Sequence, residues 1–127
     1  MEMEALSTKG PLSLMGPPLN LTPIAAVNLG MAIHELITNS VRHGAWASNG
    51  GTVAVSWKCD SSEFHFDWHE RVDPAVEELG PKGFGRKVLE HVVPVAWEGS
   101  GKLVLKHDGL HWCLRTPAKQ IVFDGVD

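Results

Sequence analysis

The sequence predicts an α+β fold, a two-layer α/β sandwich in which helices cover one face of a mixed, mostly antiparallel sheet. Two pairs of short alternating segments, each joined by a tight turn, predict two β-hairpins. One long amphipathic segment precedes the first pair, and a shorter helical segment separates the pairs. Because each helix must bury its apolar face, packing both on one sheet is the simplest arrangement.

The first elements are a short strand and a long helix. Leu12 and Leu14 alternate within residues 11–20 before a Gly-Pro-Pro break, which predicts a short edge strand. Thr22 can cap a helix whose first residue is a proline, so we expect a helix over Pro23–His43 that Gly44 ends. Its expected core face comprises Ala26, Leu29, Ile33, Leu36, Ile37 and Val41.

The later elements follow from alternation and from turn residues. Residues 71–82 contain two prolines and a glycine and predict a loop, and residues 85–92 predict a helix that ends before Pro94. The Gly50-Gly51 turn precedes the first hairpin, which residues 59–62 close. Four alternating segments predict the paired strands: residues 52–58, 63–68, 102–106 and 110–116.

Length and composition limit the class of protein. The 127 residues fit one domain, over 11–118, with a flexible lead-in or truncated linker over 1–10 and a peripheral tail over 119–127. A net charge of -4 argues against a nucleic-acid module that binds by bulk charge. With 2 cysteines, no long apolar run and no signal pattern, we expect a cytoplasmic chain without membrane contact.

The long helix carries a polar stripe. At 100° per residue Glu35, Asn39, Arg42 and His43 share one side, with Asn28 above them. Glu35 and Asn39 are one turn apart, and their oxygens suit Mg²⁺, which also binds waters and substrate phosphates. A solvent-exposed polar face is the alternative interpretation of the stripe.

Residues 34–45 read His-Glu-Leu-Ile-Thr-Asn-Ser-Val-Arg-His-Gly-Ala. This segment resembles the N-box of the ATP-binding domain of histidine kinases, in the form found in the HWE family. Arg42 and His43 stand where that family usually has lysine and tyrosine. The Trp68-His69-Glu70 segment resembles the family's Trp-x-Glu signature. Gly83-Phe84-Gly85, followed by Arg86 and Lys87, resembles its glycine-containing phosphate loop.

The resemblance covers about residues 12–117 and implies the Bergerat-type ATP-binding fold. It implies a catalytic domain of bacterial two-component signalling that transfers the γ-phosphoryl group of ATP to a histidine. Asn39 would bind Mg²⁺, and Glu35 would hold a metal-bound water or act as a base. Glu70 would accept a hydrogen bond from adenine. The implied phosphate contacts and lid residues are Arg42, His43, Gly83, Phe84, Gly85, Arg86 and Lys87.

The histidine that receives the phosphoryl group is expected on another domain. None of the seven histidines has the sequence context of the family's phosphoacceptor. A histidine-bearing dimerisation domain, in cis or in trans, is therefore the expected partner, with a response regulator served indirectly. His107 and His111 flank a turn, where two exposed residues are a simpler interpretation than a metal site.

The chain departs from the family after Glu70. The family's Gly-Gly-Pro run is replaced by Val72-Asp73-Pro74 after Arg71, and a β-branched residue tolerates positive φ poorly. This departure keeps open a degenerate, non-catalytic docking module on the same fold. A serine kinase of the anti-sigma-factor type is a third interpretation, against which the Trp-x-Glu segment argues.

Overall fold

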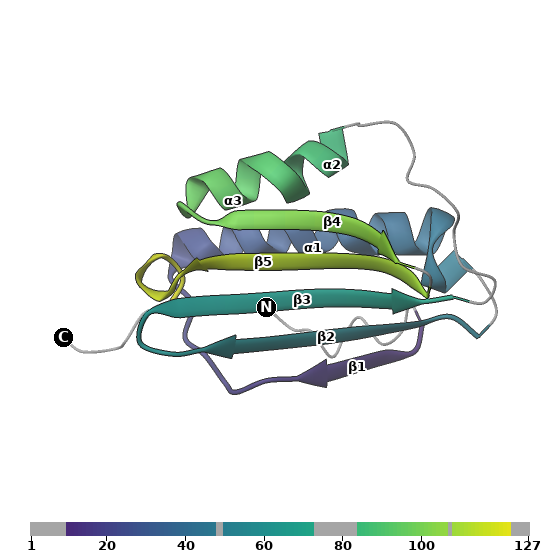
Figure 1. Ribbon diagram of the computed structural model, residues 1–127, viewed down its shortest axis with the longest axis horizontal. Coiled ribbons are helices and arrows are strands. Elements are labelled where there is room, and N and C mark those ends of the chain that lie inside the picture. Colours follow the sequence, from purple (N-terminus) through teal and green to yellow (C-terminus); the bar gives the residue numbers. More distant parts are fainter. Residues whose placement is uncertain (1–9, 48–49, 73–83, 107, 123–127) are drawn as a thin grey trace.

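The computed structural model describes residues 10–47, 50–72, 84–106 and 108–122. Its five-stranded sheet has the order β1-β2-β3-β5-β4 (Figure 1). β1 runs parallel to β2, and the other neighbouring pairs are antiparallel. The predicted fold class is confirmed, and so is the edge position of the first strand. The strands are β1 (Leu12–Met15), β2 (Thr52–Cys59), β3 (Glu63–Arg71), β4 (Ser100–Lys106) and β5 (Gly109–Pro117).

The long helix α1 spans Pro23–His43, as the sequence predicts. The Ala25 N–H donates to Thr22 Oγ1 at 3.1 Å and completes the N-cap. At the other end the Gly44 N–H donates to the Ser40 carbonyl. α1 lies behind the sheet in Figure 1 and packs its apolar face on it.

The buried face of α1 differs from the predicted one. Val41 is 43% exposed, and Ala26 and Ile37 are only half-buried. The small residues Ala25, Ala32 and Ser40 are buried instead, because small side chains let the helix lie close to the sheet. Choosing the core face by hydrophobicity alone does not take side-chain size into account. The buried residues of α1 are Ala25, Leu29, Ala32, Ile33, Leu36 and Ser40.

The second helical segment is longer than predicted. α2 (Phe84–Lys87), a π-helical turn η3 (Val88–Val92) and α3 (Val93–Ala96) follow one another without a break. The expectation that the helix ends before Pro94 is wrong. Pro94 falls in the first turn of α3 and has no N–H to donate to the preceding turn, where the Leu89 carbonyl accepts a hydrogen bond from the Trp112 indole N–H instead. The wide turn before it is closed by the Val93 N–H, which donates to the Val88 carbonyl.

The core lies between the sheet and these helices. Phe64, Phe66 and Trp68 of β3 are buried on the face that meets α1, which confirms the predicted alternation. Trp112 of β5 is buried on the same face, and its indole N–H donates to the Leu89 carbonyl at 2.9 Å. The segment over 84–96 therefore covers the same face of the sheet as α1.

Residues 118–122 are not peripheral, contrary to expectation, whereas the rest of the predicted tail, residues 123–127, lies outside the described residues. Ala118–Gln120 form a 3₁₀ turn, η4, and the next residue, Ile121, is completely buried in the core. The Thr22 N–H donates to the Ile121 carbonyl at 2.8 Å, and Leu21 pairs with Val122 in an isolated bridge. Residues 118–122 thus secure the start of α1.

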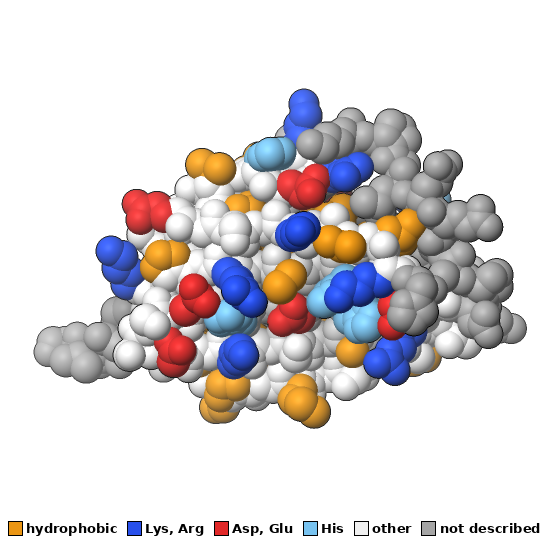
Figure 2. All heavy atoms as spheres, in the orientation of Figure 1, with side chains coloured by type: hydrophobic (Ala, Val, Ile, Leu, Met, Phe, Trp, Pro, Cys, Tyr) orange, Lys and Arg blue, Asp and Glu red, His pale blue; other side chains and the backbone are white. Residues whose placement is uncertain are grey.

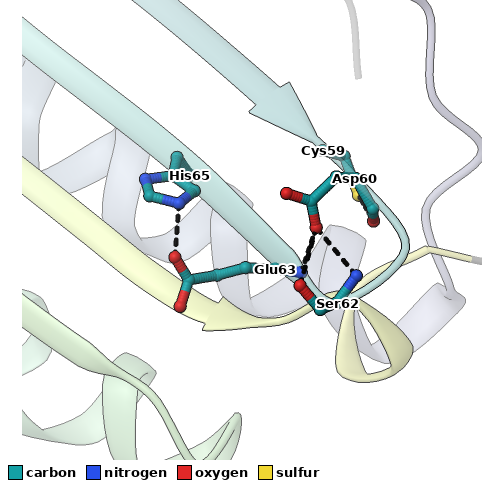
Figure 3. Close-up of polar contacts among 5 residues, drawn as sticks. All are labelled: Cys59, Asp60, Ser62, Glu63 and His65. Atoms are coloured by element: carbon teal, nitrogen blue, oxygen red, sulfur yellow. Dashed lines mark hydrogen bonds and ion pairs between the residues drawn. The ribbon is translucent and has the colours of Figure 1, made fainter.

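The β2–β3 hairpin is closed by a local side-chain cap. Asp60 accepts hydrogen bonds from the Ser62 and Glu63 N–H groups, both at 2.8 Å, and from the Ser62 hydroxyl (Figure 3). These backbone hydrogen bonds lower the pKa of Asp60. The cap fixes the strand register that carries Phe64, Phe66 and Trp68 to one face.

Within the residues described, no helix is long and apolar enough to cross a membrane.

Candidate functional site

The polar stripe of α1 is present in the structure. Glu35 and Asn39 are half-buried, and Arg42 and His43 are exposed in the last turn. One turn separates Glu35 from Asn39, about 6 Å along the helix axis. Within the described part of the chain, neither side chain makes a hydrogen bond or ion pair. Their oxygens are therefore available to a ligand.

Glu70 lies inside the protein, near the end of β3, with its side chain on the buried face of the sheet. It belongs to β3, which extends to Arg71 and so passes the predicted end at residue 68. Its carboxylate is 1% exposed and accepts hydrogen bonds from the Ala45 N–H at 2.8 Å and the Trp68 indole N–H at 2.9 Å. Burial raises the pKa of Glu70, while these hydrogen bonds oppose the rise.

Glycines surround Glu70 where no side chain fits. A Cβ on Gly44 would lie 2.2 Å from Glu70 Oε1, and one on Gly109 would lie 2.2 Å from the Glu70 carbonyl oxygen. Gly109 also has a φ of 145°, which other residues rarely adopt. Gly44 thus does more than end α1, because its missing side chain lets the 3₁₀ turn η2 (Ala45–Ala47) reach β3.

Two residues that the sequence reasoning missed complete this junction. Ser40 is buried, and its hydroxyl accepts a hydrogen bond from the Trp46 N–H at 3.2 Å. The Trp46 ring packs edge-on against Trp68, with ring centroids 6.0 Å apart. The signal in the sequence was a serine inside an otherwise helical segment, one residue from Asn39, which favours a local hydrogen bond to backbone.

The predicted phosphate loop is described only in part. Gly83 lies outside the described residues, and Phe84 and Gly85 begin α2. Arg86 is paired with Glu90 at 2.9 Å within the helical segment, whereas Lys87 is exposed. Because α2 and η3 both contact α1, the start of this segment lies beside the polar helix.

The chain after β3 accommodates the departure from the family. Val72 does not adopt positive φ; it packs against the core, and its N–H donates to the Asp108 carbonyl at 2.9 Å. The predicted conflict between a β-branched residue and the turn therefore does not arise at Val72. Asp73 and Pro74 lie outside the described residues.

These elements meet at one end of the domain. Figure 1 shows the C-terminal end of α1, the end of β3, the β4–β5 turn and α2 all toward the right of the view. Arg42 and His43 belong to the last turn of α1, and Glu70 is the penultimate residue of β3, so these residues lie at this end of the domain, with Asn39 one turn before the end of α1.

The available oxygens fit Mg²⁺ bound jointly with a phosphate-bearing ligand. Among the described residues, no group of three His, Cys, Asp or Glu side chains could hold a metal ion without help. Mg²⁺ is commonly held by one or two protein oxygens together with substrate phosphates and water. Glu35 and Asn39 supply a carboxylate and a carboxamide in that pattern.

Comparison with known sequences finds relatives over most of the chain. No family model matches. A blue-light-activated histidine kinase of Brucella anthropi is 32% identical over 116 residues, which is 88% of this chain and 24% of the relative. Blue-light-activated histidine kinase 1 of Erythrobacter litoralis is 35% identical over 81 residues, 61% of this chain and 22% of that protein. The chain spans about a quarter of the length of these curated relatives.

Solved structures share the fold. The histidine kinase domain of the Erythrobacter litoralis EL346 blue-light-activated histidine kinase superposes with a TM-score of 0.75 at 12% identity, covering 92% of this chain and 58% of that one. The ATP-binding domain of PrrB from Mycobacterium tuberculosis gives a TM-score of 0.61 at 17% identity, covering 91% and 86%. The fold is thus that of histidine-kinase catalytic domains.

Proposed function

We propose that this chain, a homologue of histidine-kinase catalytic domains, is the ATP-binding catalytic domain of a sensor histidine kinase. The observation that carries the proposal is the pair of available, half-buried oxygen ligands on α1, Glu35 and Asn39. They lie on the helix whose following turn, η2, is joined to β3 by the hydrogen bond between Ala45 and Glu70. Binding of Mg·ATP would explain why a carboxylate and a carboxamide stand one turn apart, whereas a solvent-exposed polar face requires neither.

The residues would divide the work of binding and positioning. Asn39 would bind Mg²⁺, and Glu35 would hold a metal-bound water or accept a proton. Mg²⁺ would neutralise charge that develops on the phosphates. Arg42 and His43, both exposed beside the pair, would face phosphate oxygens.

The phosphate loop would contribute from the facing element. Gly83, Phe84 and Gly85 would form the hinge and cradle of a short lid, with Lys87 and Arg86 reaching the phosphates. Arg86 would have to leave Glu90, an exchange of one carboxylate partner for another anion. Glu70 would accept a hydrogen bond from the adenine amino group through lone pairs that Ala45 and Trp68 leave unused.

The transfer itself would need a histidine from elsewhere. An imidazole nitrogen would form a bond to the γ-phosphorus, the bond to the β–γ bridging oxygen would break, and ADP would leave. The described histidine closest in sequence to the pair is His34, an exposed residue about 100° around α1 from Glu35. A histidine-bearing dimerisation domain is the proposed partner, a response regulator the eventual acceptor, and the cytoplasm the proposed location.

A non-catalytic docking module on the same fold is the alternative function. The replacement of the family glycines by Val72 and Asp73 favours it, because Val72 is drawn into the core. The available oxygens of Glu35 and Asn39 favour the kinase.

Calorimetric titration with a non-hydrolysable ATP analogue tests the proposed function. We expect saturable binding in the presence of Mg²⁺ and much weaker binding when EDTA removes the metal. A chain that binds the analogue equally with and without Mg²⁺, or does not bind it while folded, would favour the docking module.

The isolated chain is expected not to phosphorylate itself. Incubated with γ-labelled ATP and Mg²⁺, it should carry no label, because no described histidine shares the stripe of Glu35 and Asn39 except His43, which ends the helix. Adding a helical hairpin that bears a phosphoacceptor histidine should give a label that acid removes and neutral buffer preserves. Stable label on the chain alone would contradict the need for a second domain.

A further inference from the structure

The face of the sheet that the helices leave open has a distinct charge pattern. It is formed by the residues of β2, β3, β4 and β5 that point away from the core, and we call it the outer sheet face. Figure 2 looks onto it and shows Lys and Arg side chains spread over the strands, with His, Asp and Glu between them. Five cationic residues of the face are exposed: Lys58, Arg71, Lys102, Lys106 and Arg115.

Two carboxylates on this side of the sheet, Asp67 and Asp108, are only partly exposed, and each contacts a histidine. Asp67 contacts His111 Nε2 at 3.2 Å, and Asp108 contacts His69 Nε2 at 3.1 Å. The two imidazole rings lie against each other, with centroids 4.9 Å apart. His111 is thus a half-buried member of β5, and the interpretation of it as an exposed turn residue is wrong. Burial, Lys106 and His69 lower its pKa, which favours the neutral ring.

The third carboxylate follows the same pattern, since Glu63 pairs with His65 on β3 (Figure 3). Of the five cations, only Arg71 comes within 4.0 Å of a carboxylate in the described part of the chain. Five cations stand against four carboxylates, Glu63 and Asp67 on the strands and Asp60 and Asp108 in the two hairpin turns, so this side of the sheet has a net charge of +1 with neutral histidines, whereas the whole chain carries -4. The fully exposed side chains of this face are therefore mainly lysines and arginines, while Glu63, Asp67 and Asp108 are paired with histidines.

We propose that the outer sheet face is a docking surface for an acidic segment of a partner protein. Four lysine and arginine side chains without a described carboxylate partner can meet carboxylates of that segment. Nucleic acid and anionic membranes fit less well, because they extend beyond the face and would meet the net negative charge of the remaining surface. This proposal does not depend on nucleotide binding.

Fluorescence anisotropy with a labelled Glu-rich peptide tests the proposal. We expect binding that weakens as salt rises, and a loss of about tenfold or more in affinity for the Lys102→Glu, Arg115→Glu double variant. The control is the single variant Lys119→Glu, which is compared with the single variant Lys102→Glu. Lys119 is exposed in η4, outside the strands of the sheet. Both single variants change the net charge equally.

The control distinguishes binding at the outer sheet face from a general effect of the net charge of the chain. Amide chemical shifts should change along β3, β4 and β5 when the peptide binds. Equal weakening by Lys119→Glu and Lys102→Glu would overturn the proposal, as would tighter binding of single-stranded DNA or of anionic vesicles than of the peptide. If the double variant does not fold, Lys102→Ala with Arg115→Ala gives the same comparison without introducing repulsion.

Discussion

Replacing Asn39 with alanine is expected to abolish Mg²⁺-dependent binding of ATP while the fold survives. Asn39 is half-buried on the polar side of α1 and has no described hydrogen bond to lose. Alanine is also the better helix former, by at most about 0.7 kcal/mol. Calorimetric titration with the ATP analogue measures the loss of binding. Circular dichroism during thermal unfolding measures the stability, which should be unchanged or slightly raised.

Asn28→Ala is the matched control, since it removes the same side chain from the same helix. Asn28 shares the stripe but lies eleven residues earlier, about 16 Å along the axis. It should bind the nucleotide as the unaltered chain does. Equal affinity of Asn39→Ala and the unaltered chain would contradict the metal-ligand role, and equal loss in both variants would indicate a general effect on α1.

Local signals made much of the fold predictable. Thr22 and Pro23 begin α1 and Gly44 ends it, as their conformational preferences indicate. The hairpins follow from alternation and from the turns that close them, such as residues 59–62. In each case the residues that determine the element are its own neighbours in sequence, so the sequence contains the required information.

Other features depend on contacts between distant residues. The helix continues past Pro94 because a π-helical turn precedes it, and neither property is visible in a short window. Ile121 is buried because it meets the start of α1, about a hundred residues earlier. The candidate site shows the same division: the stripe was predictable from helical periodicity, but the contact of Glu70 with Ala45 was not.

Glu70→Ala is expected to have the largest effect on stability. It would leave the Ala45 N–H and the Trp68 indole N–H buried without an acceptor, at about 1–3 kcal/mol each. Chemical unfolding should therefore show a loss on the order of 2–5 kcal/mol. Glu63→Ala is the control on the same strand: its carboxylate is 45% exposed, and its loss should cost less than about 1 kcal/mol.

The stability difference should also depend on pH. Because burial raises the pKa of Glu70 above its usual 4.5, the folded state binds the proton more tightly than the unfolded chain. Its contribution to stability is therefore full below the unfolded pKa and declines as pH rises through the folded pKa. The difference between the unaltered chain and Glu70→Ala should be larger in mild acid than at neutral pH. A difference that grows with rising pH would contradict the raised pKa.

A ratio of affinities separates the structural role of Glu70 from adenine recognition. Partial unfolding of Glu70→Ala weakens every nucleotide by the same factor, so the ratio of adenine to guanine affinity is unaffected by it. If Glu70 also accepts a hydrogen bond from adenine, its loss should reduce that ratio by the equivalent of about 1.5–3 kcal/mol. An unchanged ratio, together with the expected loss of stability, would restrict Glu70 to joining η2 to β3. A reduced ratio without loss of stability would contradict the view that Glu70 acts mainly by accepting the buried hydrogen bonds from Ala45 and Trp68.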